Sequence, residues 1–195
     1  DPAEEPEPFG DGGTKMAWNT FNVVSIYPNG NPVMSDVNQR WVGDCCACAV
    51  IASMAYLYPR FVKHIIKDNM DKTYTVTMYD PKGKQISVGV GGDYFIGNSG
   101  DLGALGGRNK EVTWATILEK AMIKWNQIYQ GSSNVGGIGT EYVSAIFTGD
   151  GESVGFGANA LIAEDLQRAV EVSLKQGRLV IGGFTRSGEQ GDQNW

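Results

Sequence analysis

Apolar residues change their spacing several times along the chain, and each spacing predicts a different kind of element. Small and apolar residues run from Cys45 to Leu57 without glycine or proline, which predicts a buried helix that ends before Pro59. Apolar residues recur at helical spacing from Trp114 to Trp125, directly after a threonine suited to cap a helix. This second segment gives the strongest helical signal in the chain.

Shorter patterns predict the remaining elements. Two β-rich segments flank turn residues and predict a hairpin, at 74–79 and 85–90. Helices are expected at 60–67, 141–147 and 163–175, an extended segment at 18–28 and a strand at 179–184. Glycine-rich residues 91–107 predict a surface loop, because so many glycines disfavour regular structure. Together these elements predict an α+β fold.

The first residues differ from the rest of the chain. Residues 1–17 are rich in proline, glycine and acidic side chains, and they offer too little apolar surface to offset the entropy of ordering them. We therefore expect an acidic tail or pro-segment over this range.

Composition and charge narrow the class of protein. A chain of 195 residues with 42% hydrophobic residues is long and apolar enough to form a globular core. The formal net charge of -6 argues against a nucleic-acid partner, because such proteins concentrate Lys and Arg to neutralise phosphates. No apolar run reaches the roughly 20 residues of a transmembrane helix, so no membrane span is expected.

All three cysteines lie together, at Cys45, Cys46 and Cys48, which is too close for a disulfide framework. Cys45 stands where a loop gives way to the predicted helix, and a helix N-terminus favours the thiolate form. Chemistry alone leaves a nucleophile and a structural thiol equally open. A zinc or redox protein built on Cys45-Cys46-x-Cys48 is a further alternative. For zinc, the chain offers only one imidazole ligand, that of His64, its single histidine.

The residues around Cys45 resemble the nucleophile motif of the calpain-type cysteine proteases. That motif reads Q-G-x-x-G-D-C-W, and Gln39, Gly43, Asp44 and Cys45 stand in register with it. Cys46 replaces the tryptophan that follows the family's nucleophile, which changes the packing beside the thiol.

A second block is similar to the same family. The family pattern E-F-W-x-x-L-L-E-K-A-Y-x-K-x-x-x-x-Y matches residues 111–129, and the whole resemblance extends from about residue 29 to 184. It implies a papain-like α+β protease core, with a bacterial calpain-type thiol protease as the nearest kind. Residues 18–160 then correspond to the cysteine-bearing subdomain and 161–195 to the start of the subdomain that carries histidine and asparagine.

The resemblance implies an endopeptidase that forms an acyl-enzyme on Cys45. Gln39 would donate its amide to the oxyanion, beside the backbone N–H of Cys45. His64 follows Cys45 too closely to be the family's histidine, which lies far downstream. We therefore expect the catalytic histidine and asparagine to come from a second chain, cut from the same precursor, or from a segment beyond Trp195, and the chain alone to be inactive.

Calpain protease cores also carry calcium, and the resemblance implies a Ca²⁺ site here. Asp36 and Glu119 match the family's acidic ligands, and carbonyl oxygens near Asn29 and Asn31 would complete the shell. In the alternative, Asp36 caps a turn and Glu119 pairs with a neighbouring basic residue.

Two further expectations concern the protein as a whole. The alternative function is a non-catalytic calpain-like module that binds calcium or a protein partner. The short, acidic form of the chain resembles secreted or envelope-associated bacterial thiol proteases, with a cytoplasmic location as the alternative.

Overall fold

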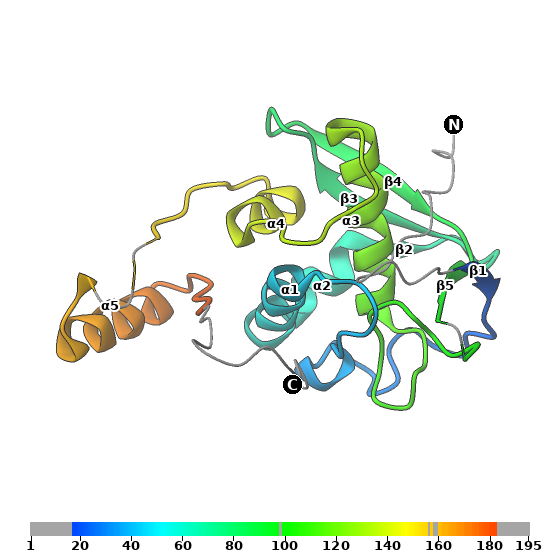
Figure 1. Cartoon of the computed structure of the whole chain (residues 1–195), viewed down its shortest axis with the longest axis horizontal. Helices are drawn as coiled ribbons and strands as arrows, with labels where there is room; N and C mark the ends of the chain where they lie inside the picture. The colour runs from blue at the N-terminus through cyan, green and yellow to red at the C-terminus, as the bar shows by residue number, and fades with distance from the viewer. Residues whose placement is uncertain (1–16, 98, 156, 158–159, 183–195) are drawn as a thin grey trace.

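The computed structural model describes residues 17–97, 99–155, 157 and 160–182, and these form an α+β fold (Figure 1). In chain order the elements are β1 (Ala17–Thr20), the 3-10 helix η2 (Met34–Asp36), α1 (Cys45–Leu57), α2 (Pro59–Ile65), β2 (Ile66–Asp68), β3 (Tyr74–Tyr79), β4 (Gln85–Val90), β5 (Asp93–Ile96), α3 (Trp114–Gln130), α4 (Thr140–Thr148) and α5 (Ala163–Lys175). The predicted α+β class and the helices at 45–57 and 163–175 are confirmed.

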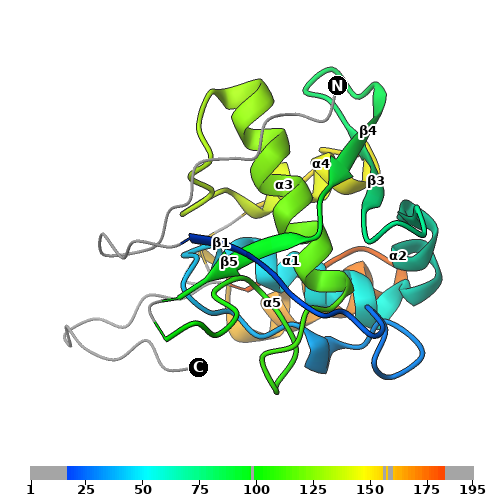
Figure 2. The same ribbon diagram turned by 90° about the vertical axis from the view of Figure 1, so that its right-hand side faces the viewer.

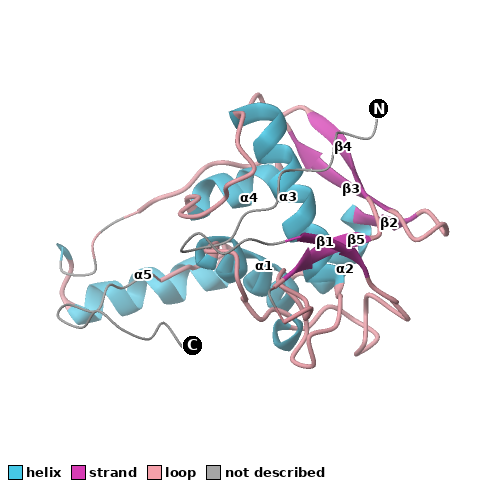
Figure 3. Ribbon diagram, turned by 45° about the vertical axis from the view of Figure 1, so that its right-hand side comes forward, coloured by secondary structure: helices cyan, strands magenta, loops and turns pink. Residues whose placement is uncertain are grey.

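The helix α3 lies at the centre of the fold, between the two sheets and α1 (Figures 1 and 3). Thirteen of its residues are buried, from Trp114 to Asn126. Thr113 caps its first turn by accepting the backbone N–H of Ala115, and Gly131 ends it in a left-handed conformation with a φ of 70°. Full burial of each large apolar side chain contributes roughly 1.5–3 kcal/mol, so α3 organises the core around it.

Two antiparallel sheets flank α3. The first has the order β2-β3-β4, with the predicted hairpin between β3 and β4, and it is tied to α3 where Trp125 Nε1 donates to the carbonyl of Tyr79 at 2.7 Å. In the second, β1 pairs with β5, and the two strands run side by side in Figure 2. The rings of Trp18 and Phe95 stack at 4.1 Å, which joins β1 to the core.

The prediction of a surface loop at 91–107 is wrong in two respects. Residues 93–96 form β5, and residues 102–107 are buried rather than exposed. Tyr94 and Phe95 supply the side chains that a strand needs, and a local count of glycines gives no weight to the partner strand β1. The buried part is explained by contacts with the loop before α1, described below.

Two element boundaries also differ from expectation. The helix predicted at 60–67 ends at Ile65, and the next residues pair with β3 as β2, because sheet pairing competes with the last helical turn. No strand forms at 179–182, and residues 183–184 lie outside the described residues. A strand needs a partner for its backbone hydrogen bonds, and the described part of the chain gives none to this segment. The predicted tail, 1–17, lies outside the described residues except for Ala17, which begins β1.

The last helix, α5, stands apart from the body of the fold (Figure 1). None of its residues is buried, and it is tied to α1 near its end by a hydrogen bond from the hydroxyl of Tyr58 to the carbonyl of Gly177. Within the described residues no single helix is long and apolar enough to cross a membrane, and α1 with α2 reach that length and composition only together, across a bend of 113°.

Candidate active site

Cys45 is the first residue of α1, and it is the exposed member of the three thiols. Cys46 and Cys48 are half-buried, and Cys48 packs against the hydrophobic core. The first N–H groups of a helix have no acceptor within the helix, and they favour negative charge beside them. Of the three thiols, Cys45 is therefore the one that combines access for a substrate with the first position of a helix.

The loop before α1 is held by the glycine-rich segment that the sequence predicted as surface. Asn38 and Gly106 form a β-bridge, with N–O distances of 3.0 and 3.3 Å. The guanidinium of Arg40 donates to the carbonyl of Gly107 at 2.5 Å, and the backbone N–H of Trp41 donates to Gly103 at 3.1 Å. These contacts fix the path of the chain from residue 38 to the nucleophile helix.

Gly106 shows why this segment requires glycine. A Cβ there would lie 2.5 Å from a methyl group of Leu102 and 2.6 Å from the backbone oxygen of Glu111. Real Cβ atoms do not approach other atoms so closely, so the neighbouring backbone would have to move. The glycines serve close packing between two loops, which a local sequence pattern does not reveal.

Gln39 lies on the same loop and is exposed. Its side-chain Nε2 donates to the carbonyl of Val42 at 2.9 Å, which folds the amide back over its own loop. An amide NH₂ has two donors, so this bond leaves the second one for another acceptor. The sequence placed Gln39 and Cys45 in one site, and the structure carries both on the single segment that runs into α1.

Two carboxyl groups lie beneath the nucleophile, Asp44 at the N-cap of α1 and Glu119 on α3. Both are fully buried, at 0% and 1% exposure, and their side chains share a hydrogen bond. Burial, followed by the negative charge of Asp44, raises the pKa of Glu119 well above its ordinary value. Sequence reasoning missed this pair because its members are 75 positions apart, although Asp44 is a motif residue.

Glu119 also holds the glycine-rich segment. Its Oε2 accepts the backbone N–H of Leu105 at 2.9 Å, while the hydroxyl of Thr116 donates to the carbonyl of Leu105 at 2.5 Å. One residue of the segment is thus bound at both backbone groups by α3. The central helix therefore supports both the loop that carries Gln39 and the N-cap of the nucleophile helix.

The contacts in the structure do not bring the four predicted calcium ligands together at one site. Asn29 donates to Asp36 Oδ1 at 2.9 Å, and Trp114 Nε1 donates to Asp36 Oδ2 at 2.7 Å, so N–H donors already face both oxygens of Asp36. Glu119 has the different partners given above, and Asn31 is exposed. The described residues contain no group of three His, Cys, Asp or Glu side chains suited to a metal. The predicted calcium site is of another kind, because it combines two carboxylates with carbonyl oxygens. The calcium site stays a prediction.

His64, the single histidine, lies far from the thiols along the fold. It is exposed on α2, which follows the end of α1 opposite Cys45. At 1.5 Å per residue the thirteen residues of α1 span about 20 Å, well beyond hydrogen-bond reach. Neither a Cys–His pair nor a zinc site with these thiols arises from His64 where it stands.

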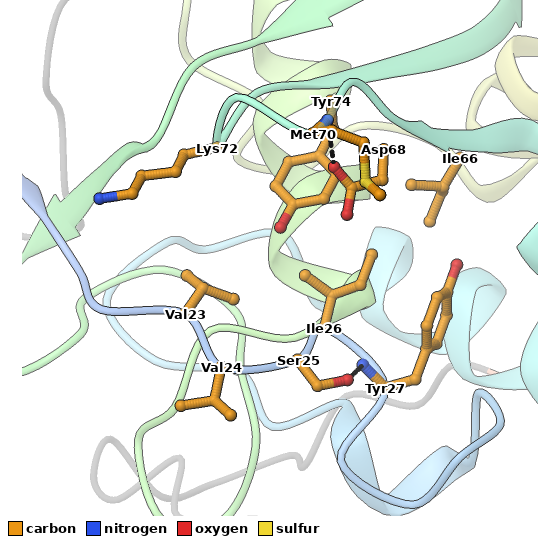
Figure 4. A pocket seen from close by; sticks show the side chains of 10 residues that line it. All are labelled: Val23, Val24, Ser25, Ile26, Tyr27, Ile66, Asp68, Met70, Lys72 and Tyr74. Carbon is orange, nitrogen blue, oxygen red and sulfur yellow. Dashed lines mark hydrogen bonds between the residues drawn. The ribbon is translucent and has the colours of Figure 1, made fainter.

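A cavity of about 390 Å³ opens elsewhere on the body (Figure 4). Val23 and Ile26 line one side, and Ile66 and Tyr74 line the other. Neither Gln39 nor any of the cysteines lines it. The candidate site is therefore an exposed helix end with its supporting loops.

Comparison with known protein families identifies a match. The sequence model of a family described as calpain family cysteine protease matches residues 18–193, which is most of the chain. A search of curated proteins gave no match.

Proposed function

The chain belongs to the calpain family of cysteine proteases, and we propose that it hydrolyses peptide bonds through an acyl-enzyme on Cys45. The observation that carries this proposal is the position of Cys45, an exposed thiol at the first residue of a helix, where Cys46 and Cys48 are half-buried. A thiolate there attacks the carbonyl carbon of the peptide bond, and the helix N-terminus stabilises the charge before attack.

Gln39 is the proposed side-chain donor for the oxyanion that develops on that carbonyl. Its bond to Val42 holds the amide in place on the loop that leads into α1 and leaves one N–H to donate. The backbone N–H of Cys45 supplies the second donor, as a first-turn group without an acceptor inside the helix. Preorganised donors of this kind stabilise the transition state more than the substrate.

The general base has to come from outside these 195 residues. His64 is the only histidine, and α1 separates it from the nucleophile. Amide hydrolysis needs a proton delivered to the leaving nitrogen as well as an activated thiol. We propose that a second chain or a further segment of the polypeptide brings the catalytic histidine and an asparagine that orients it, and that this chain by itself hydrolyses no peptide.

The test of the nucleophile compares the three thiols with a thiol-directed epoxide or iodoacetamide. Cys45 is expected to be modified first, and Cys45→Ser to remove this fast labelling and the peptidase activity of the complete enzyme while it stays folded. Cys46→Ser is the matched control and should retain most of both. Modification of Cys46 or Cys48 in preference to Cys45 contradicts the assignment, and a Cys45 that never reacts favours a non-catalytic binding module.

Two further measurements address Gln39 and the missing base. Gln39→Ala in the complete enzyme is expected to lower kcat on the order of 10²-fold or more, and an effect on KM alone would mean that Gln39 only binds substrate. The purified chain should show no turnover until the histidine-bearing segment is added. Robust turnover by the chain alone, lost in His64→Ala, would overturn the proposal of a base from outside.

A further inference from the structure

The first turn of α1 holds more thiols than an acyl-enzyme mechanism uses. Cys45, Cys46, Ala47 and Cys48 give the spacing C-x-x-C at a helix N-terminus, an arrangement that suits thiol–disulfide chemistry. Only Cys45 has a part in the proposed function, which leaves Cys46 and Cys48 without a role. The difference in their surroundings distinguishes these two.

Cys48 lies one turn along the helix from Cys45, on the same face. Side chains three apart on a helix have Cβ atoms roughly 5–6 Å apart, and a disulfide brings Cβ atoms to about 3.5–4.5 Å. An approach of the two Cβ atoms by roughly 1.5 Å within the first turn therefore joins the two sulfurs. The backbone N–H of Cys48 is bound to the carbonyl of Asp44 at 3.0 Å, whereas the first N–H groups of a helix have no acceptor within it, so the movement falls to Cys45.

The setting of Cys48 keeps it a thiol until Cys45 reacts. Cys48 is half-buried against the core, and its S–H donates to Asp44 Oδ1 at 3.4 Å. Burial, followed by the negative charge of Asp44, raises the pKa of Cys48 far above its ordinary value. An oxidant from solution therefore meets the exposed sulfur of Cys45 first, with the reduced sulfur of Cys48 one turn behind it.

Cys46 is the competing partner, and helix geometry works against it. Its side chain is hydrogen-bonded to that of Cys45, so the two sulfurs are neighbours. Adjacent residues on a helix point in different directions, however, and a bond between them closes a small ring that includes their shared peptide. That ring requires the first turn to leave helical geometry, whereas the bond to Cys48 keeps it.

We propose that Cys45 and Cys48 form a reversible disulfide after a hydroperoxide oxidises Cys45, and that this modification stores the nucleophile in a recoverable form. The modification itself stands on the thiol geometry, and only its effect on catalysis rests on the proposed function. Further oxidation of a sulfenic acid to sulfinic acid is irreversible without a dedicated repair enzyme, so a resolving thiol one turn away preserves the site.

The reaction balances with a hydroperoxide as the only added reactant. The Cys45 sulfur attacks the O–O bond, so that an S–O bond forms, the O–O bond breaks, and the peroxide is reduced as Cys45 becomes a sulfenic acid. The S–H of Cys48 passes its proton to Asp44, its hydrogen-bond acceptor, as the Cys48 sulfur attacks the Cys45 sulfur, so that an S–S bond forms and the S–O bond breaks. The hydroxide that leaves takes this proton from Asp44 and departs as water.

The test uses the full chain and needs no peptidase activity. Reduced wild type, Cys46→Ser and Cys48→Ser are treated with two molar equivalents of hydrogen peroxide, enough to take one thiol to sulfinic acid, and intact mass and iodoacetamide labelling of Cys45 are measured before and after dithiothreitol. Wild type and Cys46→Ser should lose the mass of two hydrogens as monomers. Labelling should fall by roughly tenfold or more, because a disulfide sulfur offers no thiolate, and dithiothreitol should restore it. Cys48→Ser should instead pass through a dimedone-reactive sulfenic acid to sulfinic acid, and dithiothreitol should no longer restore its labelling.

The Cys46→Ser chain decides the question even if Cys48→Ser fails to fold, because Cys45 and Cys48 are then its only thiols. Retention of both hydrogens by that chain, or its conversion into disulfide-linked dimers alone, overturns the proposal. Recovery of Cys48→Ser to the extent of wild type also overturns it and assigns the resolving role to Cys46. These masses are independent of catalysis, so a failure of the proposed function would show in peptidase assays of the complete enzyme and leave them unchanged.

Discussion

The helices α3 and α5 are both amphipathic in sequence, yet one is buried in the fold and the other is exposed. Thirteen residues of α3 are buried, and none of α5 is. Leu118 on α3 is fully buried, whereas Leu174 on α5 is 46% exposed. The same apolar pattern gives a helix in both places, but it stabilises the fold only where other elements cover it. The nucleophile is supported by the covered helix, through Glu119 and Asp44.

The largest effect is expected from truncating one leucine in each helix. Leu118→Ala should lower the free energy of unfolding by about 2–5 kcal/mol, because it removes buried methyl groups and leaves a cavity. Leu174→Ala should change it by about 0.5 kcal/mol or less, as exposed substitutions do. Urea unfolding of both variants measures the difference, and equal losses would show that α5 packs as tightly as α3 in solution.

A pair of glycines sharpens the comparison at the level of backbone contacts. Gly106→Ala should cost about 1–3 kcal/mol, because the added Cβ meets Leu102 and the backbone of Glu111. Gly155→Ala, in the segment before α5, has nothing within 4 Å of the added Cβ and should be neutral or slightly stabilising. Thermal unfolding measures the difference, and a neutral Gly106→Ala would mean that the loop before α1 and the segment 102–107 are loosely joined.

The buried pair of Asp44 and Glu119 predicts that the free energy of unfolding depends on pH, through groups packed around α3. An unfolded glutamic acid has a pKa of about 4.3, and the pKa of Glu119 is raised well above its ordinary value in the folded state. Its contribution to stability is therefore fully present below about pH 4.3 and is lost as the pH rises through the folded-state value. The slope cannot exceed about 1.4 kcal/mol per pH unit for one proton.

Glu119→Gln is expected to flatten this part of the stability curve, measured in a chelator. The control is Glu171→Gln on α5, whose carboxylate is exposed and should leave the curve as it is in wild type. Parallel curves for wild type and Glu119→Gln would show that no proton is taken up at this pair.

The smallest effect is expected from calcium, and it too should be confined to the body. We propose that millimolar Ca²⁺ raises Tm, by an amount that corresponds to about 1 kcal/mol for a ligand near its Kd or somewhat above it. Asp36→Asn should remove most of the shift. The shift should be small because the oxygens of Asp36 already accept N–H groups from Asn29 and Trp114. Identical melting curves with Ca²⁺ and with chelator would contradict the predicted calcium site.

Much of the fold follows from local patterns. The helix from Cys45 to Leu57, the capped helix after Thr113 and the hairpin at 74–90 are where the residues predict them, because their periodicity and turn residues act over a few positions. The motif through Gln39 and Cys45 likewise sits on a continuous stretch of chain. Short-range signals of this kind do not depend on what lies across the core.

The errors come from places where a distant partner decides. The strand β5 forms because β1, some 70 residues earlier, pairs with it. The segment 102–107 is buried because its Gly106 pairs with Asn38 and its Leu105 is bound by Glu119 on α3. No strand forms at 179–182, because a strand pattern without a partner has nothing to bond to.

The sequence by itself determined the helices, the hairpin and the identity of the thiol at the start of α1, because propensity, capping and motif spacing act between near neighbours. Only the tertiary structure decided that the buried side chains of Asp44 and Glu119 share a hydrogen bond, that Cys48 is half-buried while Cys45 is exposed, and that α5 remains uncovered. Burial and the charges brought near a group set its chemistry, and both depend on which distant segments the fold places together.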